Sequence, residues 1–257
     1  MTQNHAWYEG PLASFDTETT GVDVEQDRVV SAALVVQPAP NAPAEQRTWL
    51  ADPGIAIPDG ARAVHGITDE HVRAHGRPPH TVVAEIARAL AEQARAGVPL
   101  VVMNAPYDLT LLDRELRRHR GSSLAQFLDG AELLVVDPRV LDKHVDRYRK
   151  GRRTLTDLCA HYEVVLTGAH DASADATASL ELVRAIGARH RTALGALSPA
   201  ELHLRQTVWH AAQARGLQNW FDRSGTQERV DRSWPLRPVR CGCGRRLTPE
   251  HRCEAAA

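Results

Sequence analysis

Apolar segments with strand character are arranged in two different ways along this chain. Three of them follow one another before any helical pattern begins, at residues 12–17, 28–36 and 47–50. From residue 81 onward, strand-like runs at 100–103 and 133–137 alternate with segments whose apolar residues recur every three or four positions. A strand meander followed by strand–helix alternation predicts an α/β fold with a mixed sheet flanked by helices.

The helical segments carry recognisable start and stop signals. We predict helices over about 81–96, from Asn104-Ala-Pro106 onward, after Thr154, from Asp171 to Arg191, and from Ser198 to Gly216. Pro suits the first helical turn because its missing N–H costs nothing there, and Ser198 with Glu201 forms a capping-box pattern. Residues 217–257 are rich in Arg, Gly and Pro, which predicts a mostly irregular basic tail.

Composition places the chain among ordinary globular proteins. With 257 residues, 43% hydrophobic and 25% charged, it has enough apolar mass for a main domain, residues 1–195, and a smaller appendage, 196–257. No apolar run approaches the roughly 20 residues that span a bilayer, and the first residues lack the pattern of a secretory signal. Four cysteines are too few for a disulfide framework. These features predict a cytoplasmic protein without a membrane segment.

A short basic segment interrupts an otherwise acidic region. Between Arg139 and Arg153 the chain has seven Lys or Arg residues but only two acidic ones, Asp142 and Asp146, although the whole chain has a net charge of −1. Such a segment is either a solvated loop or a local binding surface for phosphates.

Acidic residues stand at the ends of the predicted elements. Asp16 and Glu18 are two positions apart at the end of the first strand, so they share one face of it. Asp108 begins the helix after the strand at 100–103, and Asp175 lies one turn into the helix that follows His170. Each position alone has a structural explanation, such as a solvated strand end or an acid favoured at a helix N-terminus. Together they predict a site at one edge of the sheet.

Four carboxylates at one edge would repel one another by about 1–4 kcal/mol for each pair at 4 Å. Cations relieve that repulsion, and an all-oxygen ligand set suits Mg²⁺ or Mn²⁺ better than zinc. Two such ions about 4 Å apart activate the attacking and leaving oxygens of a phosphodiester. The sequence therefore predicts two divalent ions held by Asp16, Glu18, Asp108 and Asp175, with His170 accepting the proton of the attacking water.

Four motifs occur in one order along the chain: Asp16-Thr-Glu18-Thr-Thr-Gly21, Val64-His65-Gly66-Ile67, Asn104-Ala-Pro-Tyr-Asp108 and His170-Asp-Ala-Ser-Ala-Asp175. With them, residues 11–190 resemble the histidine subclass of the DEDD 3′→5′ exonucleases, the family of the proofreading epsilon subunit of bacterial DNA polymerase III. The resemblance implies a ribonuclease-H-like exonuclease domain that releases nucleoside 5′-monophosphates one at a time from a 3′ end.

The resemblance also implies individual roles. Asp16 would bridge both ions and His170 would activate the water, while His65, Thr17 and Asn104 would contact the substrate. Two alternatives stay open at this point: His65 as an exposed turn residue, and Asn104 as a helix cap that orients Asp108. Cys159 falls on an apolar helix face and is predicted to be a small core residue.

The predicted substrate is the single-stranded 3′ end of DNA, and a DNA polymerase is a possible partner. An RNA-trimming exoribonuclease would use the same residues, and a non-catalytic nucleic-acid-binding module would keep the fold without the chemistry. In the tail, Cys241, Cys243, His251 and Cys253 are either a structural zinc site or part of a flexible reduced segment, because paired zinc ligands usually have two or more residues between them.

Overall fold

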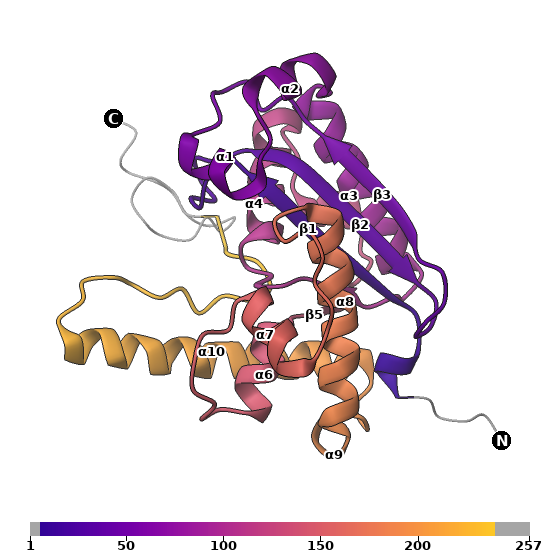
Figure 1. Cartoon of the computed structure of the whole chain (residues 1–257), viewed down its shortest axis with the longest axis vertical. Coiled ribbons are helices and arrows are strands. Elements are labelled where there is room, and N and C mark those ends of the chain that lie inside the picture. The colour runs from indigo at the N-terminus through magenta and orange to yellow at the C-terminus, as the bar shows by residue number, and fades with distance from the viewer. Residues whose placement is uncertain (1–5, 240–257) are drawn as a thin grey trace.

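The computed structural model describes residues 6–239, which form a five-stranded sheet with helices against both faces (Figure 1). The strands lie in the order β3-β2-β1-β4-β5, with bounds β1 Leu12–Thr19, β2 Val29–Gln37, β3 Glu45–Leu50, β4 Leu100–Val101 and β5 Val135–Val136. The first three strands are antiparallel neighbours, whereas β4 and β5 run parallel to β1. The predicted mixed α/β sheet is confirmed.

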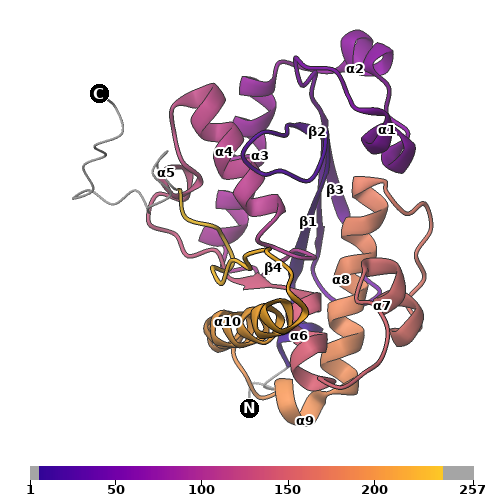
Figure 2. The same cartoon turned by 90° about the vertical axis from the view of Figure 1, so that its left-hand side faces the viewer.

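Three helices cover one face of the sheet, as the edge-on view of Figure 2 shows: α3 Pro79–Arg95, α4 Asp108–Arg120 and α5 Leu124–Leu128. Phe15 of β1 is fully buried in the apolar cluster that these helices share, together with Ile86 and Leu90 of α3 and Leu112 of α4. Burying each side chain of this size stabilises the fold by about 1.5–3 kcal/mol.

The opposite face is covered mainly by α8, Ala172–Arg189, with α6 Pro138–Val145, α7 Leu155–Tyr162 and α9 Arg191–Leu194 beside it. Leu12 of β1, Val183 of α8 and Cys159 of α7 belong to the apolar cluster on this side, which confirms Cys159 as a small core residue. The predicted cap of α7 is also present, since Thr154 Oγ1 accepts a hydrogen bond from the Asp157 N–H at 3.2 Å. Because helices occupy both faces, β1 is enclosed except at its ends.

Two short helices were not predicted: α1, Asp59–His65, and α2, Asp69–His75. Both helices begin after the last of the prolines at residues 38–58. Each has only seven residues, with too few apolar side chains to show the three- or four-residue spacing that predicts a helix. In α2 the one buried hydrophobic residue is Val72. The turn between them needs a left-handed residue, which Gly66 supplies with a φ of 73°.

The predicted start of the helix at Asn104–Pro106 is wrong, because α4 begins at Asp108. Asn104 has a φ of 61°, which no helix interior accepts. The buried carboxylate of Asp137 explains this turn: it accepts the Asn104 N–H at 3.2 Å and the Ala105 N–H at 3.0 Å. These bonds hold the backbone in a tight turn, so Pro106 lies before the helix and Asp108 becomes its first residue.

The basic segment is partly helical, since α6 includes its first seven residues. Asp142 of α6 is fully buried and accepts hydrogen bonds from Arg149 Nη2 at 3.0 Å, Arg153 Nε at 2.5 Å and Tyr162 Oη at 3.0 Å. Two of the seven cations are therefore tied to the protein interior. Of the others, Arg139 and Lys143 lie on α6, whereas Arg147, Lys150 and Arg152 follow it in a stretch without helix or strand.

The last helix, α10, runs from Pro199 to Ser224, so the predicted stop at Gly216 is wrong. The helix ends at Gly225 with a left-handed φ of 75°, and the predicted capping box of Ser198 and Glu201 begins it. The segment that returns beside α10 is more ordered than predicted, since Trp234 is buried in the core and its Nε1–H faces Asp137 Oδ2 at 3.4 Å. No helix within residues 6–239 is long and apolar enough to cross a membrane.

The N-terminal segment packs tightly on α8. The short 3₁₀ helix η1, Trp7–Glu9, crosses α8 at Gly187, and a Cβ atom added there would lie 2.3 Å from Cδ1 of Tyr8. Arg184 of α8 bonds the Tyr8 and Gly10 carbonyls, and Trp7 Nε1 donates to Leu194 O at 3.0 Å. This close approach requires glycine at position 187.

Gly187→Ala is expected to lower the free energy of unfolding by about 1–3 kcal/mol, because the methyl group overpacks the contact with Tyr8. Gly216→Ala is the matched control: it lies inside α10 with no atom within 4 Å of its added Cβ, so it should stabilise by up to about 1 kcal/mol. Urea denaturation measures both. Equal changes in the two variants would contradict the packing argument.

Candidate active site

Asp16 and Glu18 lie on the face of β1 that α8 covers. Side chains alternate along a strand, so both residues share the side of Leu12, whose apolar cluster belongs to α8, and not that of Phe15. On the neighbouring strand β2 they stand opposite Ala33 and Ser31, which are small and leave room for the carboxylates. Glu18 is buried and Asp16 is half-buried.

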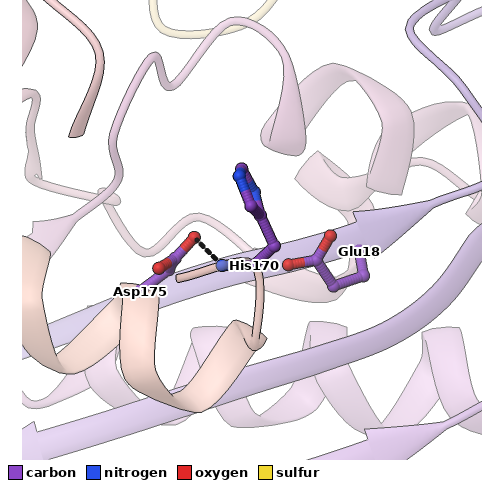
Figure 3. A group of neighbouring side chains, drawn as sticks. All are labelled: Glu18, His170 and Asp175. Atoms are coloured by element: carbon purple, nitrogen blue, oxygen red, sulfur yellow. Dashed lines mark hydrogen bonds between the residues drawn. The ribbon is translucent and has the colours of Figure 1, made fainter. Parts of the chain in front are cut away.

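Asp175 approaches these acids from the first turn of α8. The helix begins at Asp171, whose Oδ1 accepts the Ala174 N–H at 2.9 Å, and this cap fixes where Asp175 projects. His170 precedes the cap with a φ of 68°, and its backbone N–H donates to Asp175 Oδ2 at 3.3 Å. Figure 3 shows His170 between Asp175 and Glu18, and one ligand atom from each of the three lies within 4.8 Å of the others.

Asp108 reaches the same place from the other side of the sheet. β4 is parallel to β1, so the chain leaving β4 emerges at the edge where β1 ends. Thr17 Oγ1 donates to Asp108 Oδ1 at 2.6 Å, which fixes the buried carboxylate next to β1. The negative charges of Asp108, Asp175 and Glu18 all raise the pKa of Asp16. The four predicted acids therefore lie close enough to interact electrostatically, whereas the group of ligand atoms within 4.8 Å of one another contains Glu18, His170 and Asp175 but not Asp16 or Asp108.

Burial and mutual repulsion raise the pKa values of the clustered carboxyl groups. Burial, followed by the charges of the neighbouring acids, raises the pKa of Asp16 well above its ordinary value and that of Glu18 to about 8. Burial also raises the pKa of Asp175. In the protein without cations, part of the cluster therefore holds protons at neutral pH.

The donor set fits divalent cations. The cluster offers carboxylate oxygens, and Asp175 Oδ1 is buried without a hydrogen-bond partner among the described residues. Such an orphaned acceptor is costly unless a cation binds it. Cys159 is the one cysteine among residues 6–239; burial with the charge of Asp175 raises its pKa to about 11, and it does not belong to the group of candidate ligands Glu18, His170 and Asp175. Oxygen ligands of this kind suit Mg²⁺ or Mn²⁺.

Without divalent metal, the free energy of unfolding is expected to fall as the pH rises from about 4.5 to about 8. In that window the native state retains a proton on Glu18 that the unfolded chain has lost, so the unfolded state binds fewer protons and rising pH favours it. Mg²⁺ at a hundredfold excess over its Kd should add about 2.7 kcal/mol, or about 5–10 °C in Tm.

Thermal melts across this pH range test the prediction, with NaCl at equal ionic strength as the control for simple screening. Glu18→Gln is the matched variant, because it keeps the shape of the side chain but cannot titrate. Its melts should depend less on pH than those of the unmodified protein. A stability that rises with pH in the absence of metal would contradict this account of the cluster.

The three predicted substrate contacts occupy different positions around the cluster. The Thr17 hydroxyl is engaged with Asp108, which gives it a positioning role. Asn104 does not cap α4, because its Oδ1 accepts a hydrogen bond from Arg139 Nη1 at 3.0 Å and the residue at the cap is Tyr107. Asn104 still lies in the turn that leads to Asp108. Contact of either residue with substrate stays a prediction.

His65 is the last residue of α1 and is half-buried, so it is not the exposed turn residue of the alternative interpretation. Its Nδ1 accepts the Ile67 N–H at 3.0 Å, which leaves the proton on Nε2, and Nε2 is buried with no hydrogen-bond partner among the described residues. Burial lowers the pKa of the ring, the nearby Thr19 backbone opposes that shift, and the charge of His170 lowers the pKa further. His65 therefore presents a neutral N–H donor near the cluster.

No role was predicted from the sequence for Tyr107 or Asp137, and both shape this region. Tyr107 Oη and Thr19 Oγ1 lie 2.6 Å apart, and both hydroxyls bond the Gly21 carbonyl, which closes the end of β1. Asp137 holds the turn before Asp108, and its place in the sequence was a usable signal. An Asp directly before Pro138 is the pattern of a helix N-cap followed by proline in the first turn.

Comparison with known proteins identifies a family match and similar folds. A model of the exonuclease family RNase_T matches residues 14–183. Exonuclease I of E. coli, in complex with a dT13 oligonucleotide, has a similar fold with a TM-score of 0.59, 19% identity and coverage of 71% of this chain and 42% of its own. Exonuclease I of Methylocaldum szegediense gives a TM-score of 0.58 at 19% identity, over 83% of this chain and 45% of its own.

Relatives by sequence are named after DNA polymerase III. The epsilon subunit of Treponema pallidum is 28% identical over 180 residues, which are 70% of this chain and 77% of that protein. An epsilon-like protein of Rhodobacter capsulatus is 37% identical over 103 residues, which are 39% of this chain but only 14% of that protein. The chain also spans 11% of a PolC-type polymerase of Lacticaseibacillus paracasei, at 28% identity.

Proposed function

The chain belongs to the RNase_T exonuclease family, and on that premise we propose that it is a metal-dependent 3′→5′ exonuclease acting on single-stranded DNA ends. The observation that carries the proposal is the convergence of four carboxylates from three separate elements: Asp16 and Glu18 from β1, Asp108 from α4 and Asp175 from α8. A protein without turnover has no evident use for a cluster that raises the pKa values of its own acids. The fold alone would not distinguish an enzyme from a binding module.

We assign the four acids to two Mg²⁺ or Mn²⁺ ions, whose chemistry when bound is to polarise the scissile phosphate and acidify a water. Asp16 would help to hold both ions, since the charges of the other three acids all act on its carboxylate. Thr17 positions Asp108, and the cap at Asp171 positions Asp175. His65 directs its Nε2–H into this region, where a 3′-terminal nucleotide would find a donor.

His170 is assigned as the general base. Its backbone is bonded to Asp175 and its ring is exposed, so an attacking water can approach it from solvent. The left-handed φ of 68° at this residue is unusual for a side chain of its size and projects the ring beside the acids. A base must come within hydrogen-bond reach of the water that it deprotonates, and the ring nitrogen within 4.8 Å of the Glu18 and Asp175 oxygens supports that assignment.

DNA is proposed as the substrate because the relatives are named for DNA polymerase III and a fold neighbour holds a dT13 oligonucleotide. The same names suggest a DNA polymerase as a partner, which we propose as a candidate, and a cytoplasmic location stays a prediction. Gel filtration with a purified polymerase tests the first of these. The predicted zinc ligands Cys241, Cys243, His251 and Cys253 lie outside the described residues, so zinc stays a prediction.

Digestion of matched oligonucleotides tests the function. DNA and RNA of the same sequence, labelled at the 5′ end, are incubated with the protein in Mg²⁺ or in EDTA. We expect a ladder that shortens from the 3′ end of DNA and disappears in EDTA. Faster shortening of RNA would favour the exoribonuclease, an equal ladder in EDTA would exclude the metal-dependent reaction, and binding without any ladder would favour the non-catalytic module.

A further inference from the structure

A groove of about 970 Å³ is lined by residues of α6, α10 and the segment 226–239. Figure 1 shows this segment returning beside α10. We call it the α6–α10 groove. Its walls carry six Lys or Arg side chains, Arg139, Lys143, Arg147, Arg153, Arg229 and Arg237, and three acidic ones, Asp137, Glu228 and Asp231. α10 and the return segment follow residue 183, where the match to the family model ends.

The groove reaches the turn that precedes Asp108. Asn104 and Pro106 of that turn line it, whereas Asp16, Glu18, Asp108, Asp175 and His170 do not. A smaller hollow of about 470 Å³ shares Asn104, Arg139 and Arg153 with it. A strand that runs from the cluster past this turn would reach the groove after its terminal nucleotides.

The wall that α6 contributes is cationic and largely uncompensated. Arg153 is bonded to Asp142, but Lys143 and Arg147 have no acidic side chain within 4.0 Å in the described part of the chain. Burial and the charge of Arg153 lower the pKa of Lys143, the charge of Asp142 partly opposes them, and Arg147 and Arg149 lower it further, which reflects the crowding of cations on this wall. Of the acids in the lining, Asp137 is enclosed by backbone donors, and the other two stand on the return segment opposite α6. Positive charge of this kind favours a polyanion.

Aromatic rings accompany the cations. Tyr148 is 86% exposed, and the Arg147 guanidinium lies 5.6 Å from the centre of its ring. Trp209 of α10 stacks on His144 of α6, with ring centres 3.7 Å apart and planes at 10°. Flat rings beside phosphate-binding cations are typical of surfaces that bind unpaired bases, whose faces are free only in a single strand.

We propose that the α6–α10 groove binds the single strand of nucleic acid on the 5′ side of the scissile bond, with phosphates at Lys143 and Arg147 and a base stacked on Tyr148. The proposal rests on the proposed function, since the strand that it holds is the substrate of the active site. It assigns to α10 and the return segment a role in substrate binding that the matched family region does not include. The groove lengthens the footprint on the substrate beyond its terminal nucleotides.

Binding without turnover is the first test. Anisotropy of a labelled 20-nucleotide oligo(dT) is measured in EDTA for the full chain, for Lys143→Glu/Arg147→Glu, and for Arg88→Glu/Arg120→Glu, which makes the same charge change at exposed positions of α3 and α4. The groove variant should bind at least about tenfold more weakly, and the slope of log K against log salt should fall by about 1.4, or about 0.7 for each lost contact. Equal affinities for both variants would overturn the proposal.

Length dependence of hydrolysis separates this inference from the function on which it rests. For the full chain and the control variant, kcat/KM should be about tenfold or more higher for a 20-mer than for a dinucleotide, which ends before the groove. The groove variant should lose that preference. If neither substrate is cleaved, the proposed function is wrong, and the anisotropy measurement still tests whether the groove binds a single strand. If the unmodified chain cleaves both equally, the groove inference fails and the function stands.

Two further measurements test the stacking and the kind of ligand. Tyr148→Ala should weaken binding of the oligo(dT) by about fivefold or more, but not that of an abasic strand of equal length, because the abasic strand has no ring to stack. Equal weakening for both strands would exclude stacking on Tyr148. A polyglutamate peptide of the same charge should compete poorly. If it competes as well as the DNA, the groove binds an acidic protein segment and the proposal is wrong.

Discussion

Asp16→Asn is expected to lower exonuclease activity by at least about a thousandfold, because it removes the carboxylate that faces the other three acids. The side chain keeps its shape and its half-buried position on β1. The loss should therefore appear in kcat on a 20-mer, measured in Mg²⁺ with a continuous assay for released nucleotide. It should not be restored by raising the metal concentration alone, since the negative charge is gone.

The same variant should be more stable than the unmodified chain when metal is absent. Asp16 has its pKa raised partly by repulsion from Asp108, Asp175 and Glu18, and a neutral amide does not suffer that repulsion. Loss of activity together with a gain in Tm in EDTA would distinguish a functional carboxylate from a structural one. Asp129→Asn is the control, because Asp129 is exposed with a left-handed φ of 50° that Asn also accepts. A variant with near-normal activity would remove Asp16 from the proposed site.

The elements that were predicted correctly have local signals. The cap of α7 at Thr154, the cap of α8 at Asp171 and the capping box of α10 all involve contacts within four residues, so the sequence contains both partners. The strands β1 and β2 likewise show continuous apolar runs because helices cover both of their faces. The mixed sheet followed from the order of these elements.

The errors share a different cause, which is contact over a long separation in sequence. Pro106 is excluded from α4 because Asp137, 31 positions later, captures the two amide groups before it. Gly216 was predicted to end α10, but an isolated glycine costs a helix only about 1 kcal/mol, and the turns after it have contacts of their own. The buried Gln218 accepts the Val230 N–H at 2.8 Å and donates to the Glu228 carbonyl at 3.2 Å, which ties this part of α10 to the segment that returns beside it.

The sequence indicated which residues to consider for the candidate site, but not how they contact one another. The order of motifs identified Asp16, Glu18, Asp108 and Asp175, and the parallel pairing of β4 with β1 explains why Asp108 arrives beside them. The bond from Thr17 to Asp108 joins residues 91 positions apart, and nothing in the spacing of the two residues indicates it. The division of the chain near residue 195 stays a prediction, although α10 packs against α6 and β5.

His170→Gly is expected to lower kcat by about a hundredfold to ten-thousandfold, the usual contribution of a general base. Glycine adopts a φ of 68° without strain, so the turn into α8 and its bond to Asp175 should persist and the fold should not be weakened. Because the ring is exposed, added imidazole should enter the space that it leaves and restore part of the activity. Single-turnover hydrolysis of a 20-mer with and without imidazole measures both effects.

The stabilisation by Mg²⁺ distinguishes a base from a metal ligand at this position. His170 offers a ring nitrogen within 4.8 Å of the carboxylate oxygens of Glu18 and Asp175, so geometry alone permits either role. If the ring acts as a base, His170→Gly keeps the rise in Tm caused by Mg²⁺, whereas a ligand role requires that rise to shrink. His80→Gln, at an exposed position of α3, controls for loss of an imidazole elsewhere, and imidazole added to Asp16→Asn should restore nothing. A His170→Gly protein that no longer responds to Mg²⁺ would therefore exclude the general-base assignment, because carboxylates alone would then be too few to hold the ions.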